Sequence, residues 1–109
     1  MHYEQRHGDY VLLSDTGDIL LSTPQIALCF DAQSDPPVLL KHGTPERIEA
    51  HAAALRKRLL DAGLGDFADG ISVLTGAFAV DDLNRLIDTT GYLKSFLKRL
   101  GFSPAAPHA

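Results

Sequence analysis

Four short apolar runs, separated by turn-forming residues, constrain the fold of this chain more than any other feature of its sequence. They occupy residues 10–14, 19–22, 25–30 and 38–42. Runs of this length, bounded by Gly, Pro and Asp, are typical of β-strands and are too short for stable helices. Every connection between them is short enough for neighbouring strands to pair antiparallel, so the sequence predicts a β-meander in the amino-terminal part.

The residues between these runs predict where the chain turns. Gly17, within the Asp-Thr-Gly-Asp segment 15–18, can adopt a positive φ, which favours a hairpin between the first two strands. Pro24 has no amide donor and is expected to interrupt the second strand or to mark a sheet edge. Segment 31–37 contains Asp-Pro-Pro and is expected to be a turn-rich connection.

The clearest helix signal covers residues 44–62. Thr44 suits the N-cap, Pro45 suits the first helical position and Gly63 suits the end of the helix. One apolar stripe follows the 3.6-residue period and comprises Ile48, Ala52, Leu55, Leu59 and Ala62. Because such a stripe must be covered, we expect this helix to pack on the sheet.

The pattern beyond this helix predicts one more strand and then helices. Residues 63–70 are expected to form a loop and residues 71–75 a last strand whose partner the sequence does not identify. A helical pattern runs from residue 81, is interrupted by Thr-Thr-Gly at 89–91, and continues over 92–100. The predicted fold class is α+β: a small antiparallel β-meander of about four to five strands, packed by one amphipathic helix and followed by a C-terminal helix pair.

Length and composition favour one globular domain. The chain has 109 residues, and we expect a single domain over 1–103 with 104–109 as a flexible tail. An apolar share of 45% and a charged share of 22% exclude the disordered class, which needs far fewer apolar residues. The single cysteine, Cys29, has no disulfide partner, and segment 1–10 lacks a signal-type apolar run, so a cytoplasmic location is expected.

Motifs for catalysis or cofactor binding are missing from the sequence. Gly63, Gly65 and Gly70 lack the lysine of a phosphate-binding loop, and the five histidines lack the spacing of zinc ligands. Cys29 lies among apolar residues and is expected to be a small buried hydrophobe. We therefore assign no catalytic residue, no metal site and no cofactor, and expect a non-catalytic protein.

The C-terminal segment provides the leading functional hypothesis. Positions 83, 86, 90, 93, 97 and 100, all leucine except Thr90, are spaced by three or four residues, which is the a/d rhythm of a helix–helix seam, and aromatic residues add apolar area beyond it. In a small protein a second apolar face is often covered by another copy, so we predict a protein-interaction or homodimerising domain. The residues assigned to the interaction surface are Leu86, Tyr92, Leu93, Phe96, Leu97, Leu100 and Phe102. The alternative is that both helices simply belong to the core.

Two further hypotheses remain open. Segment 83–100 also matches the outline of a helix-turn-helix. This match predicts, as an alternative function, a DNA-binding regulator that contacts DNA through Lys94, Lys98 and Arg99. The net charge of −4 argues against this possibility.

The third hypothesis is a small-molecule-binding protein or enzyme with a site at the predicted strand-to-helix junction. Its candidate residues are Lys41, His42 and Thr44. Histidine titrates near neutral pH, and at such a junction a polar side chain can face a cleft. His42 is therefore the residue of greatest interest in this hypothesis.

Overall fold

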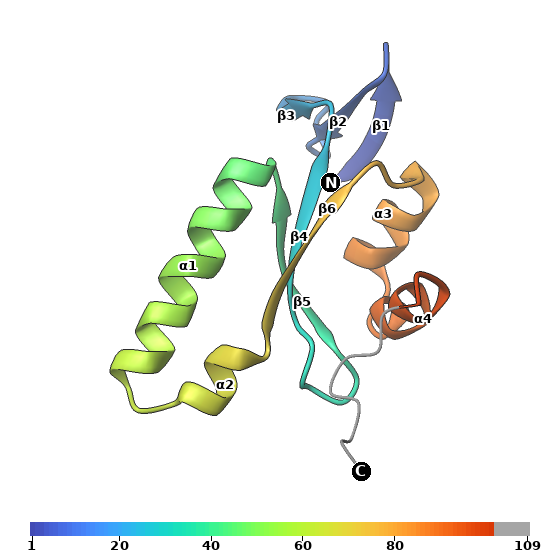
Figure 1. Ribbon diagram of the computed structural model, residues 1–109. Helices are drawn as coiled ribbons and strands as arrows, with labels where there is room; N and C mark the ends of the chain where they lie inside the picture. The colour runs from blue at the N-terminus through green and yellow to red at the C-terminus, as the bar shows by residue number, and fades with distance from the viewer. Residues whose placement is uncertain (102–109) are drawn as a thin grey trace.

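The computed structural model describes residues 1–101, which form six strands and four helices (Figure 1). The strands are β1 (His2–Arg6), β2 (Asp9–Leu13), β3 (Ile19–Thr23), β4 (Ile26–Asp31), β5 (Val38–Gly43) and β6 (Ile71–Gly76). The helices are α1 (Pro45–Asp61), α2 (Gly65–Asp69), α3 (Val80–Asp88) and α4 (Tyr92–Arg99). All strand pairs are antiparallel, and the α+β class predicted from the sequence is confirmed. None of these helices combines the length and apolar character needed to cross a membrane.

The strands form two three-stranded sheets, where the sequence predicted one continuous meander. The strand orders are β1-β2-β3 and β5-β4-β6. The chain passes from one sheet to the other at Pro24, which cannot donate a ladder hydrogen bond. Beside it, the Thr23 hydroxyl donates to the carbonyl oxygen of Gln25 at 2.9 Å and so stabilises the turn between the sheets.

The first sheet contains the predicted hairpin and one strand that the sequence did not reveal. In the β2–β3 hairpin Leu12 faces Leu21, and Gly17 has the expected positive φ of 88°. Strand β1 has a mostly polar sequence and therefore lacks the apolar alternation of a strand. The turn between β1 and β2 consists of His7 and Gly8, both with positive φ, which is the geometry of a tight hairpin turn.

The second sheet is centred on β4, whose residues 26–30 are all buried. β4 pairs with β5 on one side and with β6 on the other, which supplies the missing partner of the last predicted strand. A register shift between Cys29 and Phe30 leaves Leu40 as a bulge in β5, since Cys29 faces Lys41 and Phe30 faces Leu39. The segment predicted as a loop over 63–70 contains the short helix α2.

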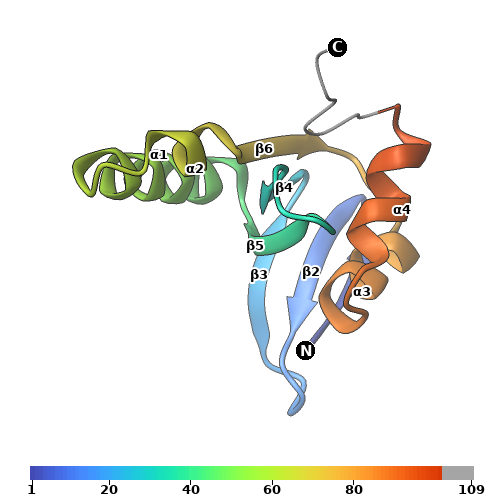
Figure 2. The same ribbon diagram turned by 90° about the horizontal axis from the view of Figure 1, so that it is seen from below.

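Helices cover both faces of this second sheet (Figure 2). On one face, α1 packs Ile48 and Ala52, both fully buried, against Ala27 and Cys29 of β4. The predicted stripe of α1 is confirmed over most of its length, but Ala62 is the exposed C-cap residue. On the other face, the larger core joins β4 to the first sheet and to α3 and α4.

Candidate functional site

The predicted helix pair at the C-terminal end is present, and most of its apolar residues belong to the core. Leu86, Leu93, Phe96 and Leu97 are each at most 6% exposed and pack against the larger core within one chain. Packing within the chain therefore accounts for their apolar character. Of the remaining residues assigned to an interaction surface, Leu100 is 53% exposed, Tyr92 is half-buried, and Phe102 lies outside the described residues.

Arg99 holds α3 and α4 together. Its guanidinium donates to Asp82 Oδ1 at 2.8 Å and to the Tyr92 hydroxyl at 2.7 Å, and that hydroxyl donates to Asp82 at 2.7 Å. These hydrogen bonds, from Tyr92 first and Arg99 second, lower the pKa of the Asp82 carboxyl. Of the three residues assigned to DNA contact, Lys94 and Lys98 lie on the exposed surface of α4, whereas Arg99 is already engaged with α3.

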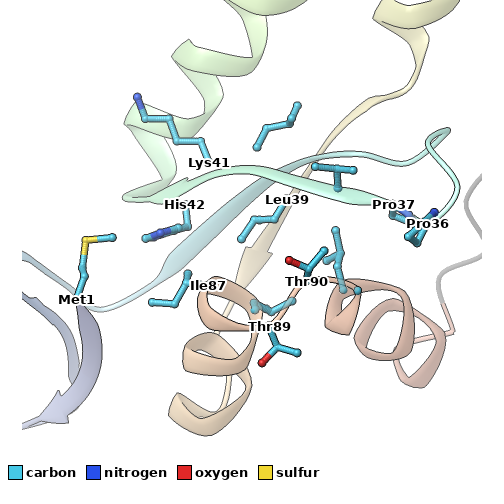
Figure 3. A pocket seen from close by; sticks show the side chains of 14 residues that line it. Met1, Pro36, Pro37, Leu39, Lys41, His42, Ile87, Thr89 and Thr90 are labelled. Carbon is cyan, nitrogen blue, oxygen red and sulfur yellow. The ribbon is translucent and has the colours of Figure 1, made fainter.

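The three residues assigned to the strand-to-helix junction do not converge on one site. Figure 3 shows Lys41 pointing toward α1, on the opposite side of β5 from His42, whose ring points toward Met1. Thr44 is the N-cap of α1 with an extended backbone, but its side chain makes no capping hydrogen bond. Only Lys41 and His42 contribute to the cleft beside β5.

That cleft, of about 340 Å³, lies between β5 and the turn that joins α3 to α4 (Figure 3). Leu39 and His42 point into it from β5, and Ile87, Thr89 and Thr90 form the opposite side. Its volume is at the lower end of the range of about 300–1,000 Å³ found for ligand sites. The lining also includes Met1, Pro36, Pro37, Val38, Leu40, Lys41, Leu86, Gly91 and Leu93.

His42 is an uncharged polar group at the end of this cleft. Its Nδ1 lies 2.6 Å from the hydroxyl of Tyr3, and the two rings meet edge to face. Burial lowers the pKa of the His42 imidazole and raises the pKa of Tyr3 to about 12. At neutral pH the hydrogen bond therefore joins a neutral phenol to a neutral imidazole.

Tyr3 is fixed in turn by Asn84 of α3. The Asn84 side chain accepts a hydrogen bond from the Tyr3 amide at 2.7 Å and donates to the Tyr3 carbonyl at 3.0 Å. This pair of bonds imitates a neighbouring strand and positions β1, and with it the phenol, against α3. The chain Asn84–Tyr3–His42 thus links α3, β1 and β5 at one end of the cleft.

β5 presents an open sheet edge directly beside the cleft. It is the outermost strand of its sheet, and within residues 1–101 its outward N–H and C=O groups have no strand partner. Val38 and Leu40 are 47% and 41% exposed on this strand. An unpaired edge of this kind is a template for an added strand, and peptide-binding domains use it in that way.

The chemical groups around the cleft are suited to binding. They contain no cluster of three His, Cys, Asp or Glu side chains placed to hold a metal ion. Every buried side-chain N or O atom among them has a hydrogen-bond partner. Cys29 is fully buried on the α1 face of β4, and burial raises the pKa of its thiol. What the cleft offers is apolar surface, threonine hydroxyls and a strand edge.

Comparison of the chain with known proteins finds no family model, no curated protein and no solved structure that matches it. The function is therefore inferred from the cleft and the strand edge beside it. Sequence reasoning had identified its polar residues on β5 but not Leu39, Ile87, Thr89 or Thr90. One available signal was Pro36-Pro37 before a short strand, because prolines beside a strand are typical of a sheet edge.

Proposed function

We propose that this chain is a non-catalytic protein-interaction domain that docks an extended segment of a partner protein on the edge of β5. The observation that carries the proposal is the position of an open strand edge directly beside a largely apolar cleft. In strand addition the main-chain hydrogen bonds provide affinity, and pockets for alternate side chains provide specificity. The open strand edge and the cleft both lie along Val38–Gly43.

The proposal moves the interaction surface from the C-terminal helices to β5. The homodimer expected from the sequence would use the exposed side of α4, where Leu100 is the one large apolar side chain that is exposed among the described residues of the assigned set. Val38 and Leu40 offer comparable exposure together with free main-chain groups. The cytoplasmic location expected from the sequence is kept in this proposal, supported by the free and buried Cys29.

A second candidate function is binding of a small molecule in the same cleft. Its support is the His42–Tyr3 pair, because a few fixed polar groups in an apolar cleft are typical of ligand sites. A diverse compound collection tests this candidate by thermal shift. Compounds that raise the Tm of the full chain and lose their effect when the cleft is filled would favour it over peptide docking.

A displayed library of random peptides, selected against the full chain, tests the proposed function. We expect enriched peptides whose binding shifts the NMR amide signals of β5 and of the α3–α4 turn at 89–91. Absence of enriched peptides would contradict the proposal. So would signal changes confined to the surface of α4 around Lys94 and Lys98.

Backbone methylation of an enriched peptide tests the mode of docking without altering the protein. Antiparallel pairing uses the amides of every second residue. Methyl groups on the amides that face β5 should abolish binding, whereas methyl groups on the intervening amides should be tolerated. Equal binding of the two methylated peptides would show that the edge is not used.

Filling the cleft provides the matched test on the protein side. Thr90 is exposed and lines the cleft, so Thr90→Trp should block the cleft and leave the core intact. The control is Thr16→Trp in the exposed β2–β3 turn. We expect peptide binding to be lost in the first variant and kept in the second, with the Tm of both close to that of the original chain.

A further inference from the structure

The two faces of the β5 edge differ in chemistry, and this difference bears on what can dock there. Leu39 and His42 both lie on the cleft side of β5, because the bulge at Leu40 shifts the alternation by one residue, whereas Lys41 points toward α1 (Figure 3). Successive side chains of a strand point to opposite faces of its sheet. Side chains of an added strand would therefore lie alternately over the cleft and beside α1.

The face beside α1 is basic. Arg56 of α1 donates to the carbonyl oxygen of Ile71 at 2.9 Å, which places its flank of the helix over β6. With 3.6 residues per turn, the opposite flank, on the β5 side, carries Arg47, His51 and Arg58. Together with Lys41 these residues form what we call the basic flank of β5.

The cations of the basic flank form no ion pair within residues 1–101. No salt bridge in this part of the chain involves Lys41, Arg47 or Arg58. The nearest carboxylate on β4 is Asp31, which faces Val38 and accepts hydrogen bonds from the Gln33 amide and the Ser34 hydroxyl. Asp61 of α1 is paired with Lys57 at 2.8 Å.

The face over the cleft is mainly apolar. Its side chains at the centre are Leu39, Ile87 and Thr90, and burial keeps the His42 imidazole neutral at pH 7 by lowering its pKa. A charged side chain placed here would lose solvation without finding a partner. Apolar side chains suit this face.

We infer that the segment docked on β5 alternates acidic with apolar side chains, the acidic ones beside the basic flank and the apolar ones over the cleft. This inference rests on the proposed function and names the chemistry of the partner. It also excludes a second copy of the chain as the favoured occupant. Antiparallel pairing of two β5 edges would bring Lys41 and Arg47 of both copies onto one face, where like charges repel.

Three short peptides that alternate valine with glutamate, with lysine or with serine test the inference against the full chain. Fluorescence anisotropy should give a Kd about tenfold lower for the glutamate peptide than for the serine peptide, as two or three exposed ion pairs would provide. The lysine peptide should bind more weakly than the serine peptide. The glutamate preference should shrink at high salt, because these charges are exposed.

Charge reversal on the basic flank supplies the matched variants. Lys41→Glu and Arg47→Glu change exposed side chains, and a glutamate in the first turns of α1 suits the positive end of the helix. Combined, they should reverse the preference so that the lysine peptide binds more tightly than the glutamate peptide. Lys94→Glu on the exposed surface of α4 is the control and should leave the preference unchanged.

The outcomes separate the inference from the proposed function. If all three peptides bind equally, the charge pattern is wrong and docking on β5 stands. If none binds, and the displayed library also yields no peptide that maps to β5, the proposed function fails as well. If sedimentation shows a dimer whose β5 amides are protected from hydrogen exchange, a second copy occupies the edge and the inference is overturned.

Discussion

At the scale of single residues, the hydrogen bond between Tyr3 and His42 ties the end of the cleft to the stability of the fold. Burial favours the neutral imidazole in the folded chain, so the pKa of His42 lies below its usual value of 6.5. The unfolded chain takes up a proton on this histidine at a higher pH than the folded chain. The contribution of His42 to stability is therefore complete above about pH 6.5 and is lost as the pH falls toward the folded pKa.

Urea unfolding at several pH values checks this expectation. We expect the free energy of unfolding to fall as the pH drops below about 6.5, and His42→Asn to flatten this dependence, because an asparagine can hydrogen-bond to Tyr3 but does not titrate. The control is His7→Asn in an exposed turn, where asparagine tolerates the φ of 52°. If the free energy of unfolding of His42→Asn still depends on pH in the same way, another group is responsible for the pH dependence.

At the scale of the elements, α3 stabilises a strand edge by means of one side chain. Asn84 satisfies both main-chain groups of Tyr3 that face away from β2, so the outer edge of β1 is closed at this point. The edge of β5 has no such cover among the described residues. Edge strands β1 and β5 therefore differ in their cover, and docking is assigned to β5 because the cleft lies beside its edge.

Asn84→Ala is expected to lower the free energy of unfolding by about 1–3 kcal/mol, since it leaves a partly buried N–H and C=O without partners. Asn84→Asp keeps the shape and the acceptor but removes the donor to the Tyr3 carbonyl. Asp88→Ala, an exposed change on the same helix, should stay within about 0.5 kcal/mol of the original chain. Urea titrations of the three variants measure these differences, and equal values for Asn84→Ala and Asp88→Ala would exclude the stabilising role.

Local signals in the sequence were sufficient for single elements but not for their assembly. The α1 helix was predicted well because its N-cap, its Pro45 and its apolar period all lie within one segment. The sheet division and the pairing of β1 depend on contacts between distant residues, such as Asn84 with Tyr3. The cleft likewise joins β5 to the α3–α4 turn, so its residues had no common pattern that sequence reasoning could detect.

At the scale of the whole molecule, β4 belongs to two cores at once. Leu28 and Phe30 pack into the larger core, while Ala27 and Cys29 pack against α1. Neither core can lose its packing without exposing one face of the same strand. We therefore expect the described part of the chain to unfold as one cooperative unit.

The positions of the three tyrosines allow the cooperativity of unfolding to be measured. Tyr3, Tyr10 and Tyr92 all lie in or against the larger core, whereas far-UV circular dichroism is strongly weighted by α1, the longest helix. Ile48→Ala removes a fully buried side chain on the α1 side and should cost about 2–5 kcal/mol. Tyrosine fluorescence and circular dichroism should then shift together to a lower denaturant midpoint. Separate midpoints would show two independently folding units.

The sequence of the same central strand also favours aggregation when the chain is unfolded. Residues 26–30 are Ile-Ala-Leu-Cys-Phe, an uncharged run with the composition of segments that assemble into cross-β aggregates when exposed. Pro24 precedes this run and Asp31 ends it, in the positions where gatekeeper residues oppose such assembly. Asp31, which orders the loop after β4, thus also places a charge where it opposes aggregation of the unfolded chain.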